Sequence, residues 1–132
     1  MTQEDKELLL KDLCARLPYG VKCENYNHID GRNVFKVTDI RDNGYICGTV
    51  NNHYCWAVFD PLELKPYLFP LSSMTEEQKM FLKQQNWCIA ISTSGTVETT
   101  VEGIDWLNKN HFDVNNLIPI GLAIDATGLN IY

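Results

Sequence analysis

A small set of cysteine, histidine and carboxylate side chains carries the reactive groups of this sequence. His53 and Cys55 lie two residues apart in a stretch with strand-like alternation, so their side chains point to one face. A thiolate beside an imidazole is the arrangement of a cysteine nucleophile. No glycine-rich turn before a helix accompanies the pair to stabilise an oxyanion. We therefore interpret both as sheet-packing residues, and we keep a Cys55–His53 enzyme as an alternative.

Metal and phosphate sites need closely spaced ligands or a glycine loop. The histidines are His28, His53 and His111, and they scatter over different predicted elements among five cysteines that form no C-x-x-C pair. Gly44-x-x-x-Gly48 falls in a predicted hairpin and is not followed by Lys-Thr and a helix. The sequence thus predicts no catalytic residue, no metal and no cofactor, and hence a protein that is not an enzyme.

Aromatic residues indicate binding instead. The densest apolar run is Ile104 to Ala123, in which Asp113 is expected to cap a turn and His111 to cover a helix end. Aromatic residues of the central stretch could form an exposed platform, but their alternation favours ordinary core and sheet packing; they are Tyr45, Tyr54, Trp56, Tyr67 and Phe69. We predict an interaction surface formed by Trp106, His111, Phe112, Tyr67 and Phe69.

Charge narrows the class of partner. The chain has 132 residues, 45% apolar, which suits one globular domain, and its net charge is -6. Through Arg41 there are seven basic and seven acidic residues, and four Lys against ten Asp or Glu follow. Nucleic-acid binding needs clustered cations and is disfavoured, although a local patch in the first third stays open. The acidic remainder fits a solvated surface or a basic partner.

Cysteine usage and hydropathy indicate the compartment. The cysteines are odd in number, the first residues, Met1 to Asp5, are polar and acidic, and no apolar run approaches the ~20 residues of a membrane span. We expect reduced thiols, a cytoplasmic location and no membrane association.

Periodicity predicts an α+β fold. Residues 1–17 form a helix, with leucines at helical spacing behind a Thr2–Asp5 capping box. Residues 18–70 form short strands with tight turns, at Asp42 to Gly44 and Asn51-Asn52, which favours a small antiparallel SH3-like β-barrel or a meander. Pro66 should confine the last strand to an edge or a bulge.

The remaining residues, 71–132, are predicted to be mainly helical and to pack on the barrel. Ser73 should cap a helix that starts at Met74, and Trp87 to Ile91 is a short apolar strand. A polar loop or hairpin with a turn at Ser94-Gly95 follows. Thr99 with Glu102 should cap the helix that carries Trp106, and Asn110 should end it in the left-handed conformation.

Several blocks resemble a group of short uncharacterised proteins of gut Bacteroides-type bacteria and their phages or mobile elements. The matching blocks are Leu17 to Lys22, Lys65 to Leu68, Pro70 to Glu77, Asp105 to Asn108, His111 to Asp113, Leu117-Ile118 and Gly121 to Ala123. The resemblance implies an intracellular small protein and no particular activity. This chain departs from the group at Phe69, where Arg is expected, and at Pro119, which interrupts a helix.

These observations favour a non-enzymatic small adaptor or accessory protein that binds another protein through the barrel edge or the Trp106 helix. The alternatives are a nucleic-acid-associated accessory protein of a phage or mobile element and the Cys55–His53 enzyme. We expect Trp106 and Leu107 to pack on opposite sides of their helix, with at least one of them against the barrel.

Trp106→Ala tests this expectation. The substitution should lower the melting temperature or abolish a pull-down interaction, because Trp106 lies in core or faces a partner. Thermal unfolding and pull-down of the variant are the measurements. A variant that matches the wild type in both would place the stretch at the periphery.

Overall fold

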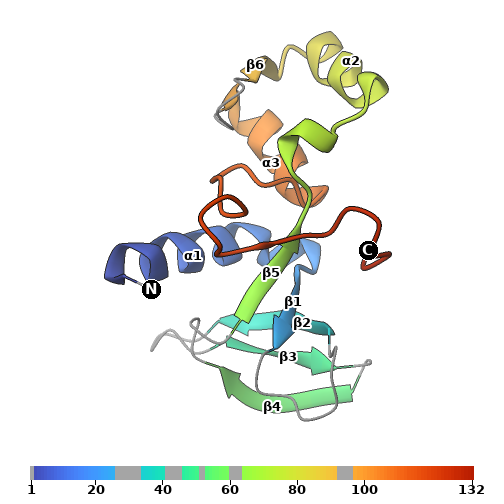
Figure 1. Ribbon diagram of the computed structural model, residues 1–132. Coiled ribbons are helices and arrows are strands. Elements are labelled where there is room, and N and C mark those ends of the chain that lie inside the picture. Colours follow the sequence, from blue (N-terminus) through green and yellow to red (C-terminus); the bar gives the residue numbers. More distant parts are fainter. Residues whose placement is uncertain (1, 26–33, 41–45, 51–52, 60–63, 92–96) are drawn as a thin grey trace.

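The computed structural model describes most of the chain and places it in two stacked parts. A sheet with helix α1 lies at one end, helices α2 and α3 lie at the other, and the C-terminal segment crosses between them (Figure 1). The described residues are 2–25, 34–40, 46–50, 53–59, 64–91 and 97–132. The predicted turns at Asp42 to Gly44, Asn51-Asn52 and Ser94-Gly95, together with His28 and Tyr45, lie outside these residues.

A run of strands lies between helical elements along the chain. In order they are α1 (Gln3–Arg16), η1 (Leu17–Tyr19), β1 (Lys22–Asn25), β2 (Val34–Ile40), β3 (Ile46–Val50), β4 (His53–Phe59), β5 (Leu64–Leu68), η3 (Leu71–Ser73), α2 (Glu76–Gln84), β6 (Cys88–Ile91), β7 (Val97–Thr99), α3 (Val101–Lys109) and β8 (Ile124–Asp125). The fold is therefore α+β, as predicted.

Helix α1 forms where its capping signals and leucine spacing place it. The Thr2 side chain accepts a hydrogen bond from the Asp5 N–H, and the Asp5 carboxylate accepts one from the Thr2 N–H. Leu9 and Leu13, one turn apart, are fully buried against the sheet. The helix ends in the 3₁₀ turn η1, which closes on Gly20 in the left-handed conformation at φ 70°.

The sheet is open, and the SH3-like barrel is not confirmed. Its order is β4-β3-β2-β1-β5-β8, antiparallel except for the β5–β8 pair. Closure would require β4 to pair at the far end of the sheet, and within the described residues it pairs with β3 alone. Strands β1 to β4 form the predicted meander, because each pairs with the next along the chain. Short strands with tight turns suit both architectures, so strand spacing could not distinguish them.

Strand β5 shows how Pro66 is accommodated inside the sheet. Pro66 pairs with Cys23 of β1, whereas β8 pairs only with Tyr67 and Leu68. At Pro66, β5 therefore has a described strand neighbour on one side only. The sheet does not need a hydrogen bond from Pro66 on the other side, which suits a residue without an N–H.

The helix caps on the C-terminal side are shifted from the predicted positions. Thr75, not Ser73, caps α2 and forms the capping box with Gln78, because residues 71–73 form η3 and Met74 is buried in an extended conformation. Thr100, not Thr99, caps α3 by accepting from the Gly103 N–H.

The other end of α3 and the hairpin before it complete this part of the chain. The left-handed residue after α3 is His111, at φ 64°, and not Asn110. The apolar run predicted as a strand forms β6, which pairs antiparallel with β7.

The described residues form two hydrophobic cores. The first lies between α1 and the sheet and is completed by residues of the C-terminal segment; it contains Leu9, Leu13, Val21, Cys23, Phe35, Val37, Ile46, Leu64, Leu68, Leu117, Leu122 and Ala123. The second lies under α2 and α3 and contains Leu71, Met74, Leu82, Leu107 and Phe112. Trp106 and Leu107 both pack on this second core, and neither belongs to the core between α1 and the sheet. The prediction that at least one of them packs against the barrel is therefore not confirmed.

A buried ion pair within α1 forms hydrogen bonds to the segment that follows α3. The Asp12 and Arg16 side chains are both fully buried, and Arg16 Nε donates to Asp12 Oδ2 at 2.8 Å. Arg16 Nη2 donates to the Phe112 carbonyl at 2.6 Å, and Asn115 Nδ2 donates to Asp12 Oδ1 at 2.9 Å. Arg16 Nη1 is buried without a hydrogen-bond partner among the described residues.

The ion pair predicts a strongly non-additive mutant cycle. Arg16→Met leaves the Asp12 carboxylate buried without its cation and should cost about 3–5 kcal/mol of unfolding free energy. Asp12→Leu with Arg16→Met removes both charges, and its cost should be clearly smaller than the two single costs added together. Urea unfolding of the four proteins measures the cycle, and additive costs would contradict the coupling.

Candidate functional site

The structure brings the five predicted surface residues together in one place. We call this group the aromatic seam: Tyr67, Phe69, Trp106, His111 and Phe112. It lies where the end of β5 meets the segment after α3. The Phe69 N–H donates to the His111 carbonyl at 2.8 Å, and the Asp113 N–H donates to the Phe69 carbonyl at 2.8 Å. The seam is therefore held by backbone pairing as well as by ring contacts.

Burial divides the seam into an interior and a surface part. Tyr67 is 5% exposed and Phe112 is 3% exposed, whereas Phe69, Trp106 and His111 are partly exposed. Trp106 stacks on Phe112 with ring centroids 5.9 Å apart, and Phe69 contacts Phe112 at 6.2 Å. Phe112 supports the Phe69 and Trp106 rings from the interior, so the partly exposed rings are the ones that can meet a partner.

Tyr132 is part of the seam although sequence reasoning missed it. Its ring stacks on His111 with centroids 3.6 Å apart and also contacts Phe69. Its hydroxyl accepts a hydrogen bond from the Lys22 N–H at 2.9 Å and donates one to the Tyr67 carbonyl at 2.8 Å. Tyr132 is 40% exposed, yet desolvation of the bonded hydroxyl raises its pKa. No local sequence pattern could signal a contact over this chain separation.

His111 is held neutral at physiological pH. Desolvation lowers its pKa to about 4, and the positive charges of Arg16 and Lys22 act in the same direction. Its Nδ1 atom is buried and has no hydrogen-bond partner among the described residues. The neighbouring Asp113 carboxylate accepts from the N–H groups of Leu117 and Ile118, as the predicted turn cap requires. Burial raises the pKa of Asp113 against the opposing effect of these two bonds.

The residues considered for catalysis and metal binding are not assembled into a site that the structure describes. The side chains of β4, including His53 and Cys55, lie outside that description. Cys23 and Cys47 are buried and Cys14 is exposed, and burial raises the pKa of the Cys23 thiol, which makes it a poor nucleophile. The described residues contain no group of three or more His, Cys, Asp or Glu placed to hold a metal ion.

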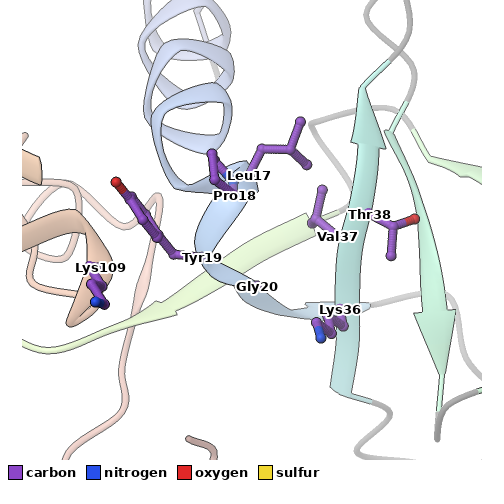
Figure 2. Close-up of a pocket in the computed structure, with 8 residues that line it drawn as sticks. All are labelled: Leu17, Pro18, Tyr19, Gly20, Lys36, Val37, Thr38 and Lys109. Carbon is purple, nitrogen blue, oxygen red and sulfur yellow. The ribbon is translucent and has the colours of Figure 1, made fainter.

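An open cleft lies where η1, β2 and the end of α3 approach one another. Figure 2 shows Tyr19 of η1 between Lys109 on one side and Lys36 on the other. The cleft has a volume of about 600 Å³ and is lined by Leu17, Pro18, Tyr19, Gly20, Lys36, Val37, Thr38 and Lys109. We call it the lysine cleft. Sequence reasoning missed it because its residues come from three separate elements.

The lysine cleft is positively charged within an acidic chain. Its lining residues include Lys36, Lys109 and Tyr19, and no Asp or Glu. Neither Lys36 nor Lys109 forms an ion pair with a described residue. A Cβ atom at Gly20 would lie 3.0 Å from Lys36 Cε, so the absence of a side chain there lets the lysine stem lie along the backbone.

Comparison with known proteins places the chain in no described group: no family model, curated protein or solved structure matches it. No described helix is long and apolar enough to cross a membrane.

The low pKa of His111 predicts a specific loss of stability in acid. An unfolded histidine takes up its proton near pH 6.5, whereas His111 in the fold does so near pH 4. Stability from the neutral ring is thus present above pH 6.5 and is lost as pH falls toward 4. The loss should be about 1 kcal/mol, below what the full shift implies, because solvent screens a partly exposed ring.

His111→Asn is the matched variant, since Asn tolerates a left-handed backbone and does not titrate. The unfolding free energy, measured with urea from pH 7 to pH 4.5, should fall less with decreasing pH for the variant than for the wild type. The carboxylates, Asp113 among them, titrate in both proteins and cancel in the comparison. Parallel profiles would show that His111 does not control acid sensitivity.

Proposed function

We propose that this chain is a non-enzymatic adaptor or accessory protein, and that its lysine cleft binds an acidic segment of a partner protein. One observation carries the proposal. Lys36 and Lys109 face a common open cleft, and neither is paired with a described carboxylate, in a chain whose net charge is -6. Unpaired cations in a predominantly acidic protein create a local field that favours an anionic ligand.

The helix ends around the cleft do not cancel this field. Helix α3 ends at Lys109, and α1 runs into η1 at the cleft wall. Each helix C-terminus carries roughly half a negative charge, which helps to explain a lysine in the last turn of α3. Two full ammonium charges exceed these partial charges.

The shape and lining favour a peptide. Leu17 and Pro18 give the cleft an apolar wall, and Tyr19 adds a hydroxyl that can bond to a backbone or a carboxylate. Its volume of about 600 Å³ is typical of sites that enclose a ligand or a few side chains. A segment with carboxylates beside an apolar residue would satisfy both parts of the lining.

A nucleic-acid partner is the weaker candidate, because the net charge of -6 repels a polyanion outside the cleft. A cytoplasmic location and a phage or mobile-element context stay predictions that follow from the sequence and its resemblance.

Binding of a labelled acidic peptide tests the proposal. The probe is a short fluorescent peptide of alternating Glu and Leu, and fluorescence polarisation at low salt measures its affinity. Lys36→Gln with Lys109→Gln should weaken binding about fivefold to tenfold, since each exposed ion pair contributes modestly. Added salt should weaken binding to the wild type as well.

The matched control is Lys11→Gln with Lys83→Gln, which removes the same charge at exposed positions away from the cleft. It should leave the affinity nearly unchanged. An equal loss in both double variants would mean that the peptide senses only net charge. A single-stranded oligonucleotide that binds through the same two lysines, while the peptide does not, would favour the nucleic-acid alternative.

A further inference from the structure

We propose a second interaction surface on helices α2 and α3, which docks a basic segment of a partner protein with an apolar anchor. The surface, which we call the α2–α3 patch, consists of Phe81, Trp87 and Trp106. It is separate from the lysine cleft, whose lining contains none of these three residues. Its evidence does not depend on the proposed function.

The patch is a contiguous aromatic surface. Phe81 packs edge-on against Trp87 with ring centroids 5.8 Å apart, and its centroid lies 5.8 Å from that of Trp106. Phe81 is 38% exposed, and Trp87 and Trp106 are partly exposed. Met80, the residue before Phe81 on α2, is 58% exposed. Aromatic residues and Met that lie together and reach solvent are typical of protein interfaces.

The second core supports the patch from beneath. Trp106 stacks on the buried Phe112 at an interplanar angle of 16°, and Trp87 packs on the same core. The backbone N–H of Trp87 donates to the Leu82 carbonyl at 3.0 Å, and the backbone carbonyl of Trp87 accepts from the Thr100 N–H at 2.8 Å. The rings are therefore positioned before a partner arrives, which lowers the entropic cost of binding.

Carboxylates accompany the patch on both helices. Glu77 precedes Phe81 by four residues and Glu102 precedes Trp106 by four, so each lies one turn away on the same helix flank. Neither carboxylate forms an ion pair or a hydrogen bond with a described residue. The patch thus carries unneutralised negative charge beside its rings.

The lysines of the two helices leave this charge in place. Lys79 and Lys83 lie two residues before and after Phe81, and residues at that spacing face away from each other on a helix. Lys79 is also paired with Glu76 at 3.3 Å. Lys109 follows Trp106 by one turn and supplies one cation beside it, so the two carboxylates stay in excess by one charge.

Charge complementarity selects the occupant. An Arg or Lys side chain can lie over the exposed rings and at the same time meet the carboxylate of Glu77 or Glu102, which combines cation–π and ionic attraction. An apolar anchor beside it would cover Phe81. The occupant is a basic amphipathic segment of another protein. With an acidic segment in the lysine cleft, the chain would carry two surfaces of opposite charge preference.

The test uses a short fluorescent peptide rich in Arg and Leu, with no aromatic residue, and the full-length chain. Fluorescence polarisation should give saturable binding. Glu77→Gln with Glu102→Gln should weaken it about fivefold to tenfold. Phe81→Ala should weaken it about thirtyfold if the ring is a central contact.

Glu4→Gln with Glu7→Gln is the matched control, because it removes the same charge from exposed positions on α1. It should change the affinity less than twofold, on the scale expected for distant surface charges. In a spectrum of indole N–H groups, the signals of Trp87 and Trp106 should move on binding. Trp→Phe variants assign those signals.

Three outcomes would each overturn the proposal: no binding to the wild type, an equal loss in the α1 control, or unmoved Trp87 and Trp106 signals. Phe81→Ala can also destabilise the fold. If the Phe81→Ala variant unfolds, the comparison of the Glu77→Gln, Glu102→Gln variant with its α1 control tests the proposal instead. Lys36→Gln with Lys109→Gln should not weaken the basic peptide. If the acidic peptide fails to bind while the basic one binds as described, the lysine cleft loses its role and the α2–α3 patch keeps its own.

Discussion

The fully buried guanidinium of Arg16 is the constraint on which the rest of the structure depends. A buried arginine stays charged because its guanidinium does not lose a proton in proteins. Its burial is therefore tolerated only where hydrogen-bond acceptors surround it. Asp12 supplies a carboxylate from the same helix, and the Phe112 carbonyl supplies the second acceptor. Since Phe112 also belongs to the second core and the aromatic seam, the position of α1 and the position of α3 are set by one group.

The sequence could predict those elements whose signals are local. Helix Gln3–Arg16 lies where leucine spacing and capping residues place it, and short strands occupy the stretch 18–70 in which they were predicted. Errors were small where neighbouring residues offered the same chemistry. Ser73 and Thr75 can both cap a helix, and the choice fell to Thr75 because Met74 is needed in the second core. Such choices depend on tertiary packing, which no local pattern records.

The candidate sites show the same limit. The five aromatic seam residues were recognised from their types and do come together, yet Tyr67 and Phe112 are buried, since type alone does not separate a ring that supports from a ring that binds. The lysine cleft could not be predicted. Lys36 and Lys109 read individually as solvated surface residues, and only the turn at Gly20 and the end of α3 give them a common cleft. The sequence likewise could not show whether the sheet is open or closed into a barrel. That depends on the pairing of β1 with β5, which are far apart in the sequence.

Tyr132 has a consequence for how the chain reaches this fold. Its hydroxyl contacts Lys22 across 110 positions of sequence, and Asn115 reaches Asp12 across 103. Contacts of this range close large loops, and such contacts are typical of proteins that fold more slowly than helical bundles of equal size. During synthesis the N-terminal helix and the first strands emerge long before their polar partners. A nascent chain that stops short of Phe112 and Asn115 holds Asp12 and Arg16 without the groups that complete their bonds. The hydrogen bonds of the buried ion pair can therefore form only after residues 112–115 have been synthesised.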